Sequence, residues 1–137
     1  MTNAELILEA KNARERAYAP YSKYMVGAAL LTKSGKIYHG CNIENAAYGP
    51  TNCAERTAFF KAIYDGEREF EKIAIVGAAQ GSDADDICAP CGVCRQVMME
   101  FCNPETFEII LAVSPEQYEI ITLKELLPMG FGPANLA

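Results

Sequence analysis

Residues 53–94, CAERTAFFKAIYDGEREFEKIAIVGAAQGSDADDICAPCGVC, decide the fold. Apolar residues recur at helical spacing over residues 53–64, and a second helical pattern begins at Cys91 and extends to Phe101. Between the two helices, residues 72–78 form a continuous apolar run that indicates a buried strand. The polar residues 80–86 that follow indicate a flexible loop. The stretch is therefore predicted to have the order helix, strand, loop, helix.

The segments on either side of this stretch continue the alternation of helices and strands. Before it we expect, in order, a helix over residues 4–18, a hairpin over residues 26–41 and an irregular loop over residues 42–52. After it we expect two strands over residues 107–113 and 118–122, and a short helix over residues 123–127. This order predicts an α/β fold, a three-layer α-β-α sandwich around a mixed sheet of roughly five strands.

Composition restricts the size and the class of the protein. The chain has 137 residues, half of them hydrophobic, which is enough for a single domain over residues 1–137 and too little for two. Twelve Lys and Arg against eighteen Asp and Glu give a net charge of −6, so we expect no nucleic-acid partner. The sequence contains neither a signal-peptide pattern nor the roughly eighteen apolar residues of a membrane helix. We therefore expect a cytoplasmic protein with no membrane partner.

Three of the six cysteines lie at predicted helix starts, which favours metal binding. Cys53 starts the first of the two helices, and Cys91 and Cys94 form a Cys-x-x-Cys motif at the start of the second. The two-residue gap lets both thiols of this motif face one ion, and a helix N-terminus favours the thiolate form. Three protein ligands would leave the fourth tetrahedral position of zinc to water, which is typical of a catalytic site.

Glu55 lies two residues from Cys53, where a carboxylate can move the protons of a metal-assisted hydrolysis. We therefore predict that Glu55 is the general base and acid. Arg56 and Arg95, on the same two helices, are candidates to offset the negative charge that three thiolates leave on a divalent ion. A solvated or salt-bridged helix residue is an equally good interpretation of either arginine.

Two other interpretations of the cysteines remain open at this point. A fourth thiolate from Cys41, Cys88 or Cys102 would close the shell of a structural zinc site, although such cysteines are more often small buried side chains. A thioredoxin-like redox role for the Cys-x-x-Cys motif is weaker, because the motif follows a long polar loop. Glu55 separates the alternatives, since a closed structural site has no use for a neighbouring carboxylate. His39, the only histidine, is interpreted as a surface or core contact.

The cysteine motifs resemble those of the zinc nucleoside and nucleobase deaminases, which carry His-x-Glu or Cys-x-Glu followed by Pro-Cys-x-x-Cys. Further stretches resemble the small cytidine deaminases in order and over nearly the whole length. They are Tyr18-Ala19-Pro20-Tyr21-Ser22, Gly40-Cys41-Asn42-Ile43-Glu44-Asn45-Ala46, Cys53-Ala54-Glu55-Arg56-Thr57-Ala58, Glu125-Leu126-Leu127-Pro128 and Phe131-Gly132-Pro133.

This resemblance implies a hydrolase of pyrimidine salvage that deaminates free cytidine, and 2′-deoxycytidine as well, to the uridine product and ammonia. It implies one Zn²⁺ per subunit on Cys53, Cys91 and Cys94, with Glu55 as the proton shuttle and not a ligand. It also implies a homotetramer with shared active sites. The nucleoside contacts that it implies are Asn42, Glu44, Tyr24, Tyr48, Phe131 and the backbone N–H of Ala54. Tyr24 stands where the family usually has phenylalanine, and a related deaminase of another pyrimidine is the nearest alternative.

Overall fold

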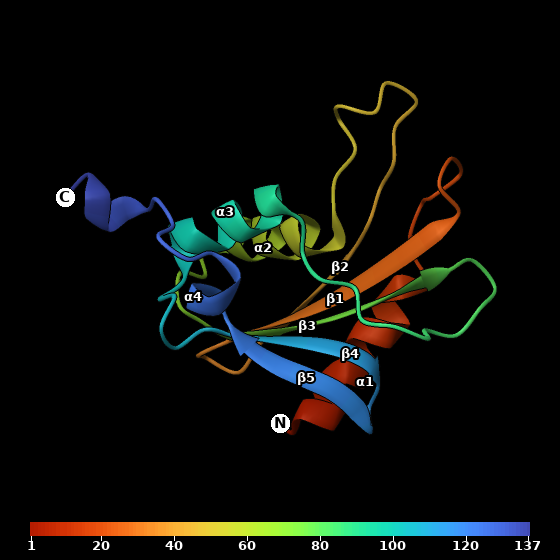
Figure 1. The fold of residues 1–137 in the computed structure, drawn as a ribbon, viewed down its shortest axis with the longest axis horizontal. Coiled ribbons are helices and arrows are strands. Elements are labelled where there is room, and N and C mark those ends of the chain that lie inside the picture. The colour runs from red at the N-terminus through yellow and green to blue at the C-terminus, as the bar shows by residue number, and fades with distance from the viewer.

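The computed structural model describes residues 1–137 and contains the predicted succession of helices and strands (Figure 1). The elements are α1 (Asn3–Arg14), β1 (Tyr24–Thr32), β2 (Ile37–Cys41), α2 (Ala54–Tyr64), β3 (Phe70–Ala79), α3 (Gly92–Phe101), β4 (Glu108–Ser114), β5 (Gln117–Thr122), α4 (Leu123–Leu126) and a terminal 3-10 turn, η1 (Pro133–Asn135). The sequence pattern did not indicate this last turn. None of the helices combines the length and the apolar character needed to cross a bilayer.

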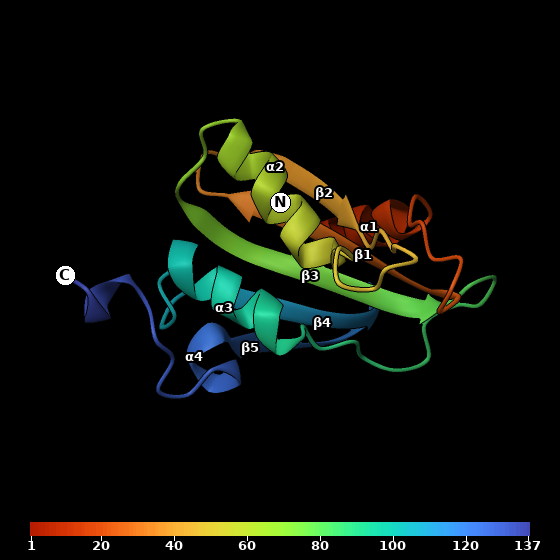
Figure 2. The same cartoon turned by 90° about the horizontal axis from the view of Figure 1, so that it is seen from above.

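The five strands form one mixed sheet in the order β2-β1-β3-β4-β5. Strands β3 and β4 are parallel, whereas the other three pairings are antiparallel. The parallel pair follows from the crossover through α3, which returns the chain to the end of the sheet where β3 began. Helix α1 covers one face of the sheet, and α2, α3 and α4 lie on the other (Figures 1 and 2). The predicted three-layer α-β-α sandwich is thereby confirmed.

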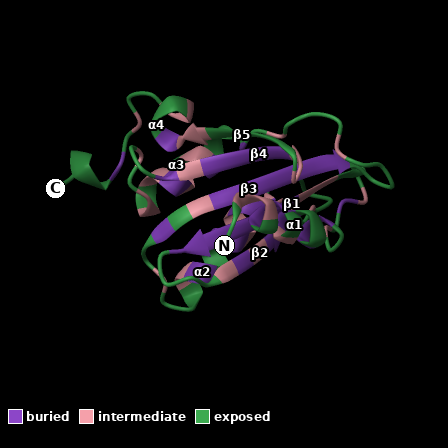
Figure 3. Cartoon of the chain, turned by 90° about the horizontal axis from the view of Figure 1, so that it is seen from below, coloured by how far each residue is buried: buried purple, intermediate pink, exposed green.

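Strand β3 is buried on both faces, which explains its continuous apolar sequence (Figure 3). Ile73 and Ile75 belong to the larger core cluster, which includes residues of α2 and α3. Ala74 and Val76, on the alternate face, belong to the smaller cluster with residues of α1. The alternation of the strand therefore assigns each side chain of β3 to one of the two helical layers.

The first helix ends at Arg14, so the predicted end at residue 18 is wrong. The backbone N–H of Tyr18 donates to the carbonyl of Asn42 at 2.9 Å, and the N–H of Glu44 donates to the carbonyl of Tyr18 at 2.8 Å. Tyr18 also forms an isolated bridge with Ile43. Helical periodicity continues past Arg14, but these contacts with a distant loop draw the chain out of the helix.

Gly40 allows β2 to approach the first turn of α2 very closely. A Cβ atom at this position would lie 2.1 Å from the carbonyl oxygen of Ala54 and 2.7 Å from the backbone nitrogen of Ala58. Any side chain would therefore push the helix away from the strand. The contact fixes the position of the N-terminus of α2, where Cys53 and Glu55 lie.

Candidate active site

Three thiols converge where the N-termini of α2 and α3 meet. Cys53 is the N-cap of α2, Cys91 is the N-cap of α3, and Cys94 lies in the first turn of α3. Their sulfur atoms all lie within 4.8 Å of one another. Neither N-cap side chain accepts a capping hydrogen bond from a backbone N–H of its own helix. The structure thus brings together the three cysteines that the sequence predicted as ligands and leaves their sulfurs directed toward one point.

The spacing of these sulfurs fits one tetrahedral zinc ion. Zn–S bonds of about 2.3 Å at tetrahedral angles separate two thiolate sulfurs by about 3.8 Å. The Sγ atoms of Cys53 and Cys91 are 3.7 Å apart. Cys41, Cys88 and Cys102 lie outside the group, so no fourth thiol closes the shell. All six cysteines are free, with no disulfide within the Cys-x-x-Cys motif. The cluster therefore fits a three-ligand zinc site better than a closed structural site.

Arg56 supplies positive charge to the cluster. Its Nη2 atom donates a hydrogen bond to the Sγ of Cys53 at 3.2 Å. Hydrogen bonds from Cys94 and from Arg56 lower the pKa of Cys53 to about 5, and the pKa of Cys94 is raised because its thiol donates one of them. Arg95 has a different role, since it donates to the carbonyl of Pro90 at 2.8 Å and to a carbonyl at the end of α4 at 2.7 Å. Only one of the two candidate arginines thus contacts the thiols.

Glu55, the second residue of α2, is buried beside the thiols with 4% of its surface exposed. Burial, followed by the negative charge of Cys53, raises the pKa of Glu55 to about 7. The backbone N–H of Glu55 itself, at the start of the helix, lowers this pKa and offsets part of the rise. Ala54, fully buried beside it, begins the helix, and the first N–H groups of a helix have no partner within it. The arrangement can hold and move a proton next to a metal site.

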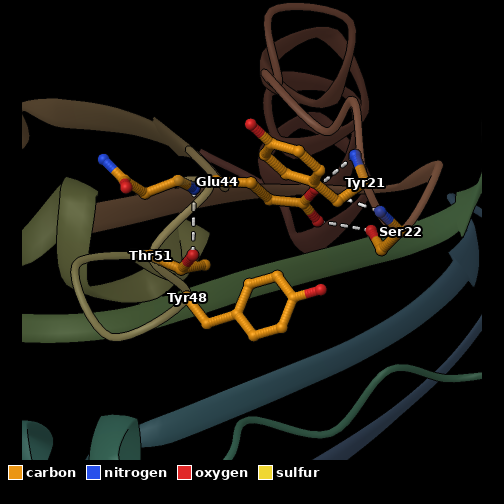
Figure 4. A pocket seen from close by; sticks show the side chains of 6 residues that line it. Tyr21, Ser22, Glu44, Tyr48 and Thr51 are labelled. Carbon is orange, nitrogen blue, oxygen red and sulfur yellow. Dashed lines mark hydrogen bonds between the residues drawn. The ribbon is translucent and has the colours of Figure 1, made fainter.

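A second region, a pocket of about 380 Å³, lies among the loops before β1 and after β2 (Figure 4). It is lined by Tyr21, Ser22, Glu44, Asn45, Tyr48 and Thr51. The Glu44 carboxylate accepts hydrogen bonds from the backbone N–H of Tyr21 at 3.0 Å, the N–H of Ser22 at 3.1 Å and the Ser22 hydroxyl. The bonds from Ser22 lower the pKa of Glu44. Because a carboxylate has about four acceptor positions, one remains for a ligand hydroxyl.

Tyr24 and Asn42 are tied to this pocket through backbone hydrogen bonds. The Asn42 side chain accepts from the N–H of Val26 at 2.9 Å and donates to the carbonyl of Tyr24 at 2.8 Å. The N–H of Tyr24 donates to the hydroxyl of Ser22 at 3.0 Å, and that hydroxyl also bonds Glu44. Three predicted contact residues, Tyr24, Asn42 and Glu44, therefore belong to one network at the start of β1.

Tyr48 and Phe131, the other two predicted side-chain contacts, lie far apart in the chain's own fold. Tyr48 is 75% exposed, has a left-handed φ of 58° and meets Tyr21 edge-to-face at 6.4 Å between ring centroids. Phe131 is 58% exposed and lies on the C-terminal segment. That segment lies at the end of the molecule opposite the loop of residues 42–52 (Figure 1). The structure does not bring Phe131 to the pocket of its own chain.

Sequence reasoning did not assign a role to Ser22 or to Tyr21. Their contacts with Glu44 cross 22 and 23 positions of sequence, so no local spacing indicates them. The available signal was their place in the stretch from Tyr18 to Ser22. His39, by contrast, lies outside the site, where its Nε2 is 2.9 Å from the carboxylate of Glu9.

Comparison with known proteins agrees with this geometry. A family model described as "Cytidine and deoxycytidylate deaminase zinc-binding region" matches residues 1–109. The cytidine deaminase of Sporosarcina psychrophila is 52% identical over 97% of this chain and 93% of that protein. The cytidine deaminase of Halalkalibacterium halodurans is 50% identical over 96% of this chain and 95% of that protein. A crystal structure of cytidine deaminase from Burkholderia pseudomallei has a TM-score of 0.87 and 50% identity, covering 96% of this chain and 100% of that one.

Proposed function

Because the chain belongs to the cytidine and deoxycytidylate deaminase family, we propose that it hydrolyses free cytidine to uridine and ammonia. One observation carries this proposal. A buried carboxylate, Glu55, lies beside three thiols whose spacing fits a zinc ion with one open position. A closed structural site offers neither the open position nor a reason for the buried carboxylate.

The residues of the thiol cluster have separate roles in the proposed reaction. Cys53, Cys91 and Cys94 would hold Zn²⁺, which when bound acidifies water for attack on the pyrimidine at neutral pH. Glu55 accepts one proton of the attacking water and transfers it to ring N3; it then accepts the second proton from the new C4 hydroxyl and delivers it to the departing amine. Arg56 stabilises the Cys53 thiolate through its 3.2 Å hydrogen bond. The unpaired N–H of Ala54 donates to the base carbonyl and orients the ring.

The network around Glu44 suits the ribose of a free nucleoside. Three donors hold the Glu44 carboxylate in place, and its remaining acceptor position would receive the 3′-hydroxyl. Asn42 retains one N–H donor after its bond to the Tyr24 carbonyl, and this donor would reach the same sugar. Because 2′-deoxycytidine keeps the 3′-hydroxyl, we include it as a substrate. Conversion of these free nucleosides to uridine and 2′-deoxyuridine would give the enzyme a role in pyrimidine salvage.

Assembly of several copies would complete the nucleoside pocket. The pocket is open on the side of Tyr48, while the exposed Phe131 lies at the far end of its own chain. A neighbouring subunit would supply the Phe131 that this chain cannot bring to its own pocket. We therefore propose a homotetramer with shared active sites. Light scattering combined with activity measurements on dilution tests this, since a fully active monomer would contradict it.

The proposed reaction is tested by incubating metal-replete protein with cytidine. Conversion to uridine lowers the ultraviolet absorbance of the base, and the ammonia released should match this loss mole for mole. Chelator-treated protein serves as the control, and its activity should return when zinc is added back. Absence of turnover by the metal-replete protein would reject cytidine as the substrate and favour the deamination of a different pyrimidine.

A further inference from the structure

The side chains of Tyr24 and Cys88 converge over a gap in strand β3. Gly77 lies two residues after Ile75 in β3, so both positions are on the same face of the sheet, the one covered by α2 and α3. A Cβ atom at Gly77 would lie 3.0 Å from the Sγ of Cys88 and 3.0 Å from the Cε1 of Tyr24. Val26, two residues after Tyr24, pairs with Gly77 across the sheet. The missing side chain at Gly77 therefore makes room for both the ring and the thiol.

This convergence lies between the two halves of the candidate site. The backbone of Tyr24 is hydrogen-bonded to Asn42 and Ser22, which places it at the ribose end. The negative charge of Glu55 acts on Cys88 as well, since burial and then this charge raise the pKa of the Cys88 thiol. Burial and the neighbouring Cys88 thiol likewise raise the pKa of Tyr24. A nucleoside whose sugar meets Glu44 and whose amino group meets Glu55 must place its base beside the Tyr24 ring.

We propose that Cys88 is a positioning residue for the pyrimidine, with its sulfur accepting a hydrogen bond from the Tyr24 hydroxyl and fixing the ring beside the base. This inference rests on the proposed deaminase function. A ring that is held in place loses less conformational entropy when the nucleoside binds. The contact should therefore act on substrate affinity, while the chemical step depends on Glu55 and the thiol cluster. Because the thiol engages the hydroxyl, the ring face is the part of Tyr24 that meets the base.

A double-mutant cycle on cytidine deamination tests this role. Cys88→Ala and Tyr24→Phe should each raise KM about threefold to tenfold, the range expected for one buried hydrogen bond. The kcat of each variant should stay within about twofold of the wild type, because the groups that move protons are unchanged. The double variant should be no worse than the poorer single variant, since both changes remove the same contact. The Kd for the product uridine, measured by calorimetry, should shift by the same factor.

Two further variants separate positioning from a general effect on folding. Cys88→Ser keeps a hydrogen-bond acceptor and should restore a KM within about twofold of the wild type. Cys102→Ala removes another half-buried thiol, one outside the site, and should leave KM unchanged. Metal analysis should find one zinc per chain in every variant, and loss of zinc in Cys88→Ala would overturn the proposal by making Cys88 a ligand.

Three other results would overturn the positioning role of Cys88. If the KM factors of the two single variants multiply in the double variant, the hydroxyl acts on the nucleoside directly and the positioning role fails. An unchanged KM in Cys88→Ala also overturns it, provided that the wild type converts cytidine. Zinc-loaded wild type that does not convert cytidine would reject the proposed function, and this inference with it.

Discussion

The thiol cluster and the pocket around Glu44 are built in opposite ways. The cluster is formed by the first residues of two helices packed on the core, and Glu55 and Cys94 are both buried there. The pocket is formed by loops, and its aromatic residues Tyr21 and Tyr48 are exposed. The comparison shows that one chain buries Glu55 and Cys94, which we propose for chemistry, but leaves Tyr21 and Tyr48 of the proposed nucleoside pocket exposed. Changes at the two regions should therefore have effects of different kind and size.

The largest effect should come from removing a thiol of the cluster. Cys91→Ala should abolish both zinc binding and cytidine turnover, because two thiols cannot hold the ion that three hold. The pocket around Glu44 should remain folded, since Cys91 is exposed and outside the two core clusters. Metal analysis measures the zinc content of the variant, and circular dichroism shows whether its fold is kept. Full zinc occupancy in this variant would show that the ligand assignment is wrong.

Glu55→Gln should affect catalysis within the cluster without affecting the metal. We expect kcat to fall by roughly a hundredfold to ten-thousandfold, the contribution of a general acid and base. Zinc content should stay at one per chain, because the three thiols are unchanged. Measuring kcat and zinc content in the same preparation of Glu55→Gln tests this prediction. Parallel loss of both would assign Glu55 to the metal shell and remove it as the proton shuttle.

The same contrast explains which parts of the site could be predicted from sequence. Cys53, Glu55, Cys91 and Cys94 lie at helix starts with short spacings, so local pattern and the family resemblance indicate them directly. The partners of Glu44 lie 22 and 23 residues away, and only the folded chain reveals them. The convergence of Cys88 and Tyr24 at Gly77 is equally remote in sequence. Chemistry fixed within a helix turn is visible in the sequence, whereas contacts between loops are not.

The fold shows the same division between local and remote causes. The buried strand β3 and the hairpin of β1 and β2 were predicted because their patterns are local. The end of α1 was predicted wrongly because the helical periodicity continues past Arg14, whereas the backbone hydrogen bond from Tyr18 to Asn42 takes the chain out of the helix. The sequence shows that Gly40 has no side chain. It does not show that α2 packs against β2 at this position.

In the pocket, Glu44→Gln should have a smaller effect that appears in substrate selection. We expect KM for cytidine to rise by roughly tenfold to a hundredfold, because a hydroxyl bonds a charged acceptor more strongly than a neutral one. Wild type should discriminate strongly against 3′-CMP, whose phosphate replaces the 3′-hydroxyl donor and repels the carboxylate. In Glu44→Gln, the ratio of kcat/KM for cytidine to kcat/KM for 3′-CMP should be smaller than in the wild type. The zinc content of the variant should not change. In the wild type, equal kcat/KM for cytidine and for a cytosine-containing oligonucleotide would contradict the free-nucleoside assignment.

The smallest effect should come from Ser22→Ala, which weakens the support of Glu44 without removing its charge. The hydrogen bonds from Ser22 lower the pKa of Glu44 in the folded protein. A carboxyl group whose folded pKa lies below its unfolded value stabilises the fold above the unfolded pKa, and this contribution is lost as the pH falls through the folded pKa. Because the pair is exposed, Ser22→Ala should lower Tm by only about one or two degrees near neutral pH.

The dependence of this Tm difference on pH identifies its cause. The difference should shrink as the pH falls from about 4.3, the usual pKa of glutamate, through the lower pKa of folded Glu44. A pH-independent remainder should persist, since Ser22 also accepts the 3.0 Å hydrogen bond from the N–H of Tyr24. In a Glu44→Gln background, Ser22→Ala should show only this remainder at every pH. A Tm difference that stays constant from neutral to acid pH in the otherwise wild-type protein would mean that Ser22 supports the start of β1 and not the carboxylate.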